Sequence, residues 1–523
     1  MFVTSGNGSG HSNGNSSWSV EQGRPTAGGG ASYACGLSPE LMRECPRNAC
    51  VWAAAQNGQQ PTYTIVGYAL GNYPLVNIAK VREATAFRIS GAVITTKIEE
   101  AGGFTDAVGP GIEYSLNHLG TKKFISFGSS NSPLAVTIVD YFRPDAATLP
   151  ESENYLHPWM ELKKPVYDEA FKVAEELGLD LGSKAGVAAL YKLTALELTR
   201  ERGLRTKAIV RGYELGGKHK KDVQIASIYH DAVRNIVYPL DMSASLMDLF
   251  QQSETITGIV VAPPPQHKAK CMCFVCCDSR DNMGDSFSKN EGDVLTNASI
   301  AAFFPPHTVL VNGETHPSLR DLRRALKEGM RDFKVRGHSD CGGIRADVKM
   351  VRDNTSIGTL LDPWLEQAAP VIREVLTFAE GTGMSDDMLH ELVDKRVKTW
   401  SANNMADYLE FLGHQDATVG AYFRDLMTRS IEVLPLTDTI QDTYDKMLHP
   451  EKIEYYSLAT VFDPKEIAHL CPKKDKFNGT NPMLEELFVM SAAYAKPKHK
   501  RAETRLQPVR EQVQVGDLTP QMA

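Results

Sequence analysis

The chain has 523 residues, of which 42% are hydrophobic and 23% charged, an ordinary composition for a soluble globular protein. This length exceeds what one hydrophobic core supports, so we expect roughly two to four domains. The formal net charge of −8 gives no general attraction to nucleic acid or to anionic lipid. No apolar run reaches the roughly eighteen residues of a membrane span and no secretory signal is recognisable, so we expect a cytoplasmic protein.

Four regions are expected along the chain. Residues 1–31 are dominated by Gly, Ser and Asn, a composition that cannot bury a core and that predicts a flexible tail. Two related domains are expected next, the first at 32–240 and the second at 241–440. The remaining residues, 441–523, are expected to form a C-terminal extension and tail.

Apolar patterns predict the same three elements in each of the two domains. In the first, a strand at 63–66 precedes an amphipathic helix at 112–120 and a second strand at 124–127. In the second, the corresponding strand, helix and strand are expected at 272–276, 322–329 and 333–335. Alternating strands and helices are typical of parallel βαβ units, so we predict an α/β fold with parallel-core sheets flanked by helices.

The two halves are also related in sequence. Gly120 ends the predicted helix of the first half eight residues before Gly128 (128 − 120), and the same pair recurs 209 residues later (329 − 120 and 337 − 128). Further on, residues 156–166 and 361–371 share Leu, Pro, Trp, Glu, Pro and Val in the same order. Chance is a poor explanation of both matches, so we infer a tandem duplication.

Three reactive side chains follow the first predicted strand of the second half. Cys276, Asp278 and Arg280 alternate along the chain, so they can share one face if the extended geometry continues. A thiolate at this place can bind a metal ion. The planar guanidinium of the arginine can hold the carboxylate through two hydrogen bonds and keep it ionised.

A second reactive group follows the next strand. His338 and Cys341, with Gly337, Gly342 and Gly343 around them, predict a tight turn that offers one imidazole nitrogen and one thiolate. Both groups lie at the carboxyl ends of predicted strands, where ligands bind in α/β sheets. Two cysteines and one histidine leave a fourth tetrahedral position open, which is typical of a catalytic rather than a closed structural zinc site.

The cysteines could also belong to a closed structural zinc site or to a redox motif. A closed zinc site could combine Cys273 and Cys276 with His338 and Cys341, but 62 residues (338 − 276) separate the two pairs, far more than in compact zinc fingers. A redox Cys-x-x-Cys motif is disfavoured because its cysteines lie inside an apolar strand and not at the start of a helix.

Residues 274–280, Phe-Val-Cys-Cys-Asp-Ser-Arg, and 335–344, Val-Arg-Gly-His-Ser-Asp-Cys-Gly-Gly-Ile, resemble the β-class carbonic anhydrases. The resemblance implies one Zn2+ per chain, held by Cys276, His338 and Cys341. It also implies an activity, the reversible hydration of CO2 to bicarbonate by a zinc-bound hydroxide.

The same resemblance gives roles to the carboxylate and the arginine. Asp278 would orient the zinc-bound hydroxide as a hydrogen-bond acceptor, or would become the fourth zinc ligand in a closed resting form. Arg280 would hold Asp278 away from the metal. His307 and His316 are candidates for the proton shuttle only through their proximity in the sequence.

The chain departs from the family pattern in one nearby segment. The family has a Gly-Asp followed by Arg-Asn-Ala-Gly-Asn. Here Gly292-Asp293 and Asn297-Ala298 are retained, but the spacing is shorter and the arginine is missing. The chain is also much longer than ordinary members of the family. These departures concern the substrate pocket and the overall architecture more than the metal site.

The first half lacks the reactive residues. At the offset of 209, the ligand, carboxylate and arginine positions are occupied by Gly67, Ala69, Gly71, Ser129 and Ser132. None of these can replace the chemistry, so the first half is expected to bind no zinc there. Because family members usually work as dimers with residues lent across the interface, the resemblance implies that the two halves pack as an internal pseudodimer.

Rival functions follow from the same residues. The site could hydrolyse a CO2 analogue such as carbonyl sulfide or carbon disulfide, or the protein could be a non-catalytic zinc-binding scaffold. The Asp278–Arg280 pair argues against the scaffold, because a structural zinc site has no use for it. Expected partners are CO2 and bicarbonate, with a homo-oligomer or a larger carbon-fixation assembly in the cytoplasm or in a microcompartment as further expectations.

Overall fold

The computed structural model describes residues 61–67, 75, 86–91, 107–143, 157–215, 222–263, 269–281, 287, 293–307, 316–426, 430–457 and 481–494. The tail expected at 1–31 and the last residues of the chain lie outside these ranges. Within them, no helix combines the length and the apolar character that crossing a membrane requires.

The first half builds a six-stranded sheet in the order β2-β1-β3-β4-β5-β6. Strands β2, β1, β3 and β4 are parallel to one another. Strand β5 is antiparallel to β4, and β6 is antiparallel to β5. The strands are β1 (Tyr63–Gly67), β2 (Ala86–Ser90), β3 (Lys123–Ser129), β4 (Gln224–Asp231), β5 (Ile236–Leu240) and β6 (Ile259–Val260).

The second half builds a sheet in the order β8-β7-β9-β10-β11-β12, with the same strand directions. Its strands are β7 (Cys271–Cys276), β8 (Val294–Ser299), β9 (Asp332–His338), β10 (Thr418–Arg424), β11 (Ile431–Leu434) and β12 (Tyr455–Ser457). Each strand of one sheet therefore has a counterpart in the other, and the predicted α/β fold with parallel-core sheets is confirmed.

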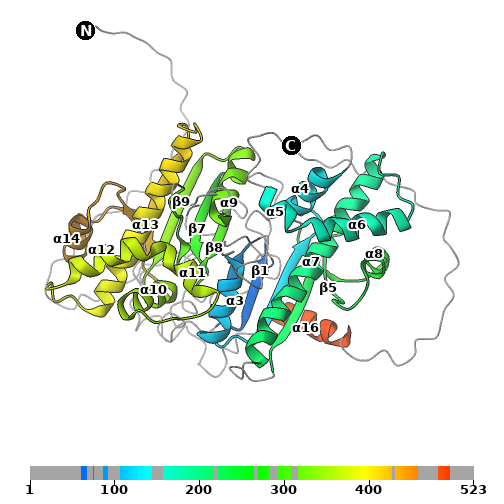
Figure 1. Ribbon diagram of the computed structural model, residues 1–523, viewed down its shortest axis with the longest axis horizontal. Helices are drawn as coiled ribbons and strands as arrows, with labels where there is room; N and C mark the ends of the chain where they lie inside the picture. Colours follow the sequence, from blue (N-terminus) through cyan, green and yellow to red (C-terminus); the bar gives the residue numbers. More distant parts are fainter. Residues whose placement is uncertain are drawn as a thin grey trace, which may run out of the picture.

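Helices flank both sheets (Figure 1). In the first half they are α3 (Val108–Asn117), α4 (Pro133–Phe142), α5 (His157–Glu161), α6 (Lys164–Glu176), α7 (Lys184–Leu215) and α8 (Leu246–Thr255). In the second half they are α9 (Pro317–Lys327), α10 (Gly342–Asp353), α11 (Leu361–Leu365), α12 (Ala369–Ala379), α13 (Asp386–Phe411) and α14 (Ile440–Leu448). Short 3-10 turns occupy Ile300–Ala302, Glu366–Ala368 and Pro450–Lys452, and α16 (Pro482–Tyr494) follows near the C-terminus.

The sheet register corrects part of the sequence alignment of the two halves. In the first sheet Tyr63 pairs with Lys123, whereas in the second Cys271 pairs with Asp332. The offset is therefore 209 at the third strand (332 − 123) but 208 at the first (271 − 63). At this offset the counterpart of Cys276 is Tyr68, which lies outside the described residues, and not Gly67. The offset of 209 was read from the glycine pairs at 120 and 128 and at 329 and 337. These glycines follow the first strand, so they do not reveal a one-residue difference in the loop between that strand and the helix.

The expected boundaries at 240 and 440 do not coincide with the edges of the sheets. Strand β6 lies after residue 240 but pairs with β5 of the first sheet, and β12 lies after residue 440 but pairs with β11 of the second. Helix α16 returns to the first half, where Leu484, Leu487 and Phe488 pack into a core cluster with strands of the first sheet. Antiparallel additions of this kind depend on edge pairing, which the apolar pattern does not reveal.

The two halves share a hydrophobic core. One cluster of buried side chains includes Val66, Phe87 and Ile112 of the first half together with Val275 and Trp364 of the second. Strand β2 contacts β8, and α3 contacts α11; Figure 1 shows α3 and α11 near each other where the two halves meet. Burial of apolar surface therefore joins the halves as it joins the elements within each half.

Candidate metal centre

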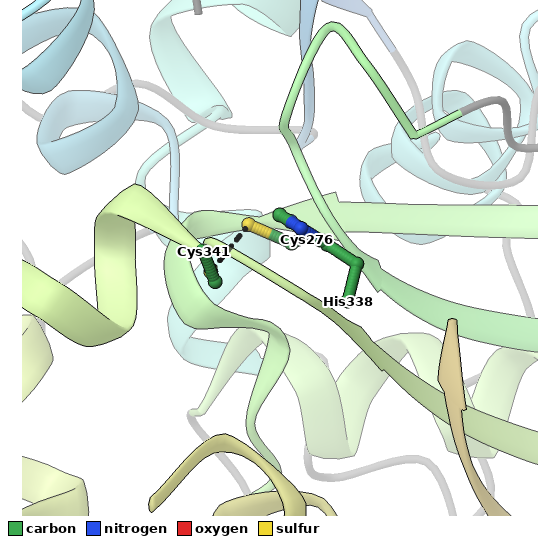
Figure 2. Close-up of side chains that lie close together, drawn as sticks. All are labelled: Cys276, His338 and Cys341. Atoms are coloured by element: carbon green, nitrogen blue, oxygen red, sulfur yellow. Dashed lines mark hydrogen bonds between the residues drawn. The ribbon is translucent and has the colours of Figure 1, made fainter. Parts of the chain in front are cut away.

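The three predicted ligands meet at one end of the second sheet. Cys276 is the last residue of β7, His338 is the last residue of β9, and Cys341 lies at the N-cap of α10. Because β7 and β9 are adjacent and parallel, their carboxyl ends lie at the same edge. The sulfur and nitrogen donor atoms of the three residues all lie within 4.8 Å of one another, and all three residues are buried. Figure 2 shows the side chains pointing toward one another.

The orientation of His338 suits a metal ligand. Its Nδ1 lies 2.9 Å from the carbonyl oxygen of Ser339, so Nδ1 carries the proton and donates to that oxygen. Nε2 is then the nitrogen available to a metal ion, and this buried atom has no hydrogen-bond partner among the described residues. Such a fixed tautomer is the usual arrangement of a histidine that binds a metal through Nε2.

The two thiols also suit a cation between them. The sulfur atoms of Cys276 and Cys341 lie 3.5 Å apart. A hydrogen bond with Cys276 and then burial raise the pKa of Cys341 well above its usual value. Burial lowers the pKa of His338, but the neighbouring Cys341 and Asp278 outweigh it and raise this pKa to about 10. Two thiolates are therefore favourable here only beside a positive charge, and this donor set fits Zn2+.

Asp278 and Arg280 form a buried ion pair beside these ligands. Arg280 donates from Nε to Oδ1 of Asp278 at 3.0 Å and from Nη2 to Oδ2 at 2.7 Å. The backbone N–H of Arg280 adds a bond of 2.8 Å to Oδ1. Oδ2 of Asp278 lies 3.8 Å from Nε2 of His338. The carboxylate is thus held at the edge of the ligand cluster with a fixed direction.

Asp340 locks the arginine in turn. Its Oδ2 accepts from Nη1 of Arg280 at 2.6 Å, and its carbonyl oxygen accepts from Nη2 at 2.7 Å. Asp340 has a φ of 57°, so the turn between the two ligands of the second group contains a left-handed residue other than glycine. The guanidinium of Arg280 therefore bonds to the carboxylates of Asp278 and Asp340 and to the backbone of the turn that contains Asp340.

A second buried ion pair was not predicted from the sequence. Asp281 accepts from Arg336 at 2.7 Å and from Arg424 at 2.8 Å, and its side chain is fully buried. Burial raises the pKa of Asp281, but the two guanidinium groups outweigh it and hold this pKa well below its usual range. Arg336 lies in β9 and Arg424 is the last residue of β10, and they lie 55 and 143 residues from Asp281 in the sequence. No local pattern marks such distant partners.

Asp394 is a second residue that sequence reasoning missed. Its Oδ2 accepts from the backbone N–H of His338 at 3.1 Å, and Lys398 pairs with its Oδ1 at 2.8 Å. This carboxylate lies against Gly337, where an added Cβ would come within 2.7 Å of Oδ1. At Gly343 an added Cβ would lie 2.9 Å from the backbone nitrogen of Ala301. Close approach therefore explains two of the three glycines in the motif.

The first half contributes a wall to this centre. Tyr114 of α3 belongs to the same buried cluster as Cys276 and Cys341. Burial raises the pKa of Tyr114 well above its usual value, and the charges of Cys341 and Asp278 add to the effect. The ring of Phe87 stacks on that of Tyr114 with 6.0 Å between the ring centroids, so this wall contains an aromatic pair.

The two suggested proton shuttles differ in their surroundings. His316 is buried at the N-cap of α9, where its Nδ1 accepts from the N–H of Ser318 at 3.2 Å and its ring stacks on Trp364. Burial lowers the pKa of His316 to about 3, so the ring does not pick up a proton near neutral pH. His307 packs against Tyr408 and Phe411 near the end of α13.

Other expectations concern cysteines and the first half. Cys273 is buried in β7 and does not belong to the group of three donors, and burial raises its pKa to about 12. In the first half, Ser129 bonds to Asn131 at 2.6 Å and Ser132 caps α4. Among the described residues of that half, no group of three potential metal donors occurs.

Comparison with known proteins gives one family. Residues 271–417 match the family described as carbonic anhydrase. No curated protein matches the chain.

Among solved structures, the chain is similar to the β-carbonic anhydrase CafA of Aspergillus fumigatus, with 18% identity and a TM-score of 0.28, over 34% of this chain and 82% of that one. It is also similar to the Coccomyxa β-carbonic anhydrase in complex with acetazolamide, with 16% identity and a TM-score of 0.29, over 42% of this chain and 95% of that one. A structure from a study of two tetrameric β-carbonic anhydrases of Sordaria macrospora gives 16% identity and a TM-score of 0.27, over 32% and 80%.

Proposed function

We propose that this chain, whose residues 271–417 match the carbonic anhydrase family, is a zinc-dependent enzyme that hydrates CO2 reversibly to bicarbonate. One observation carries the proposal. The buried Cys276, His338 and Cys341 donors converge, and the carboxylate of Asp278 lies beside them in the grip of Arg280. The three donors could bind a zinc ion, and the carboxylate of Asp278 could accept a hydrogen bond from a water or hydroxide bound to that ion.

The three ligands and the carboxylate of Asp278 have different roles in the proposed reaction. Cys276, His338 and Cys341 would hold Zn2+. When bound, Zn2+ lowers the pKa of a coordinated water toward neutrality and so supplies a nucleophile at physiological pH. Asp278 would accept a hydrogen bond from that nucleophile, while Arg280 holds the carboxylate in a fixed direction through its hydrogen bonds. Water and CO2 yield bicarbonate and one proton, which leaves to solvent.

The wall from the first half gives the substrate its place. CO2 has no net charge and no strong hydrogen-bonding groups, so an apolar surface suits it better than a polar one. Tyr114, whose ring stacks on that of Phe87, supplies such a surface near the thiols. The buried position also limits access of bulk water, which strengthens the electrostatic contacts of Asp278.

We propose that the two halves arose by duplication and pack as an internal pseudodimer. Counterpart strands β2 and β8 lie side by side. Contacts between other elements are reciprocal, because α3 packs on α11 while Arg320 of α9 stacks on Trp159 of α5 at 4.6 Å. A self-complementary arrangement of this kind is what a twofold dimer interface has, and here it would lie within one chain.

The test is CO2 hydration measured by stopped flow on the full zinc-loaded chain. We expect catalysis by the wild type and a loss of about 100-fold or more in Asp278→Ala, with zinc content unchanged. Asp416→Ala is the matched control, because Asp416 is exposed and pairs with Arg331 away from the ligands.

Three results would contradict the proposal or a part of it. Full zinc with no hydration in a properly assembled wild-type protein would favour a non-catalytic scaffold. Hydrolysis of carbonyl sulfide or carbon disulfide without CO2 hydration would favour an enzyme acting on a CO2 analogue. Equal rates for wild type and Asp278→Ala would remove the role proposed for the carboxylate.

A further inference from the structure

Arg88 of the first half reaches the segment of the second half that carries Asp278 and Arg280. The backbone N–H of Arg88 donates to the carbonyl oxygen of Cys277 at 3.3 Å. Its side-chain Nη2 donates to the carbonyl oxygen of Asp281 at 2.8 Å. These two carbonyls stand at the ends of residues 277–281, named here the dyad segment. One residue therefore holds both ends of the segment.

The position of Arg88 in its own sheet has a counterpart in the second half. Arg88 pairs with Ile65 in the first sheet, and Thr296 pairs with Cys273 in the second. The offset of 208 is the same for both pairs (296 − 88 and 273 − 65). The second half thus has a threonine on the strand where the first half has an arginine, and the arginine of the first half extends across to the second.

Other contacts of the dyad segment come from the second half. The N–H of Cys277 donates to Ser299 at 3.1 Å, and the carboxylate of Asp281 is held by Arg336 and Arg424. The N–H of Asp281 bonds to the carbonyl of Asp278 at 3.2 Å, which closes a turn within the segment. The side chain of Arg88, which belongs to the first half, donates to the carbonyl oxygen of Asp281 at the end of this turn.

We propose that Arg88 is a positioning residue for the Asp278–Arg280 pair, so that the half without metal ligands completes the catalytic site of the other half. The inference rests on the proposed function. Without the guanidinium, the carbonyl of Asp281 loses its donor and the turn from Asp278 to Asp281 gains freedom to move. A displacement of the Asp278 carboxylate by about 1 Å is enough to slow a reaction that depends on its direction about 100-fold.

The experiment is a double-mutant cycle on the full zinc-loaded chain, with Arg88→Ala, Asp278→Ala and the double variant. We expect Arg88→Ala to keep its zinc and to lower kcat for CO2 hydration about 10- to 100-fold, with a smaller change in KM. In the Asp278→Ala background, the same substitution should change the rate less than about twofold, because the carboxylate that it positions is gone.

Two further variants complete the design. Arg88→Lys keeps a positive charge and a single donor group, so it should recover part of the rate, and it replaces Arg88→Ala if that variant does not fold. Arg211→Ala is the matched control, since Arg211 is an exposed arginine on α7 of the same half. It should behave as the wild type in every assay.

A readout that does not depend on activity separates this inference from the proposed function. Hydrogen exchange of the amides of Arg280 and Asp281 reports the two bonds that they make to Asp278. We expect exchange at these amides to be about tenfold faster in Arg88→Ala and unchanged in Arg211→Ala.

Unchanged exchange and unchanged kcat in Arg88→Ala would overturn the inference. Equal rate losses in the presence and absence of Asp278 would also overturn it, because they would indicate a general structural role. If the wild type failed to hydrate CO2, the proposed function would fall, while the exchange experiment would still decide whether Arg88 orders the dyad segment.

Discussion

His338 and Asp278 of the candidate metal centre are both held in place by hydrogen bonds to further residues. Nδ1 of His338 is fixed by the carbonyl of Ser339, and its backbone by Asp394. Asp278 is fixed by Arg280, which is fixed in turn by Asp340. Such supports hold a reacting group within a fraction of an ångström of its working position.

The sequence predicted the three donors and the hold of Arg280 on Asp278, but it predicted neither the contact of Asp394 with His338 nor the ion pairs of Asp281. Cys276, His338 and Cys341 could be chosen because thiols and imidazoles are rare and their spacing follows predicted strands. Asp281 and Arg424 carry ordinary charges, and their pairing depends on how β7 and β10 are placed in the sheet. Only the three-dimensional arrangement brings them together.

Asp281 gives a stability prediction at this scale. Asp281→Asn removes the negative charge between Arg336 and Arg424 and leaves two buried guanidinium groups without their partner. We expect the free energy of unfolding at pH 7 to fall by about 3 to 5 kcal/mol, measured by urea denaturation. Asp353→Asn, at an exposed position, should change it by less than about 0.5 kcal/mol.

The sign of the pH dependence follows from the lowered pKa of Asp281. Its contribution should be complete above the unfolded value of about 3.9 and should be lost as the pH falls through the folded value. A variant as stable as the wild type at pH 7 would contradict the role of this ion pair.

His316 gives a pH prediction. Its folded pKa is about 3, whereas the unfolded value is about 6.5, so the unfolded chain binds more protons between these two values. Stability should therefore decrease as the pH falls below 6.5, by about 1.4 kcal/mol per pH unit from this group alone. His316→Phe should lose about 2 kcal/mol less than the wild type between pH 7 and pH 5 in urea titrations.

His449→Phe serves as the comparison for that experiment, because His449 is half exposed. It should follow the wild-type pH dependence. If His316→Phe and the wild type lost the same free energy over this range, burial of a neutral His316 would be refuted.

At the scale of elements, the strands that position the centre were predictable and their neighbours were not. The strand expected at 63–66 became β1, and the helix expected at 112–120 became α3, which begins four residues earlier (112 − 108) and ends at Asn117. Strand β2 was not predicted, because Arg88 in its middle and only five residues give a weak apolar signal. That arginine lies in the strand because the other half accepts its hydrogen bonds.

The contact between α3 and α11 depends on one buried carboxylate. Glu113 of α3 accepts from the backbone N–H groups of Thr359, Leu360 and Leu361 at 2.9, 2.7 and 2.8 Å. Tyr213 of α7 also donates to Glu113. Three amides at the start of α11 are thus satisfied by a side chain of the other half, which attaches the second half to the helix that carries Tyr114.

Removal of this carboxylate should weaken the whole chain. Glu113→Ala leaves these amides without an acceptor, and we expect a loss of about 3 kcal/mol in the free energy of unfolding. The thermal unfolding midpoint of Glu113→Ala should be compared with that of Glu161→Ala, an exposed position on α5. Identical midpoints for the two variants would show that Glu113 does not join the halves.

At the scale of the whole molecule, the two halves share one hydrophobic core. The core cluster that contains Cys276 and Cys341 also contains Phe87 and Tyr114, so neither half buries its apolar surface alone. The sequence predicted the repeat through its matching residues. It could not predict which faces meet, because the contact surfaces are apolar in the same way as the interior of each half. Location in the cytoplasm and association with a larger assembly stay predictions.

Separation of the halves tests this unity. A fragment spanning residues 261–457 exposes the side chains that the first half covers, so it should associate into large aggregates on size-exclusion chromatography. It should also have little CO2 hydration activity, because the wall and Arg88 are absent. A monodisperse fragment with the activity of the full chain would contradict the shared core.

The zinc content of the purified full-length protein tests most directly whether the chain holds a single zinc site. We expect about one zinc per chain in the wild type and close to none in Cys341→Ser, because the ligand set of the second half is complete only with both thiols. Two zinc ions per chain, or one that persists in Cys341→Ser, would contradict this expectation.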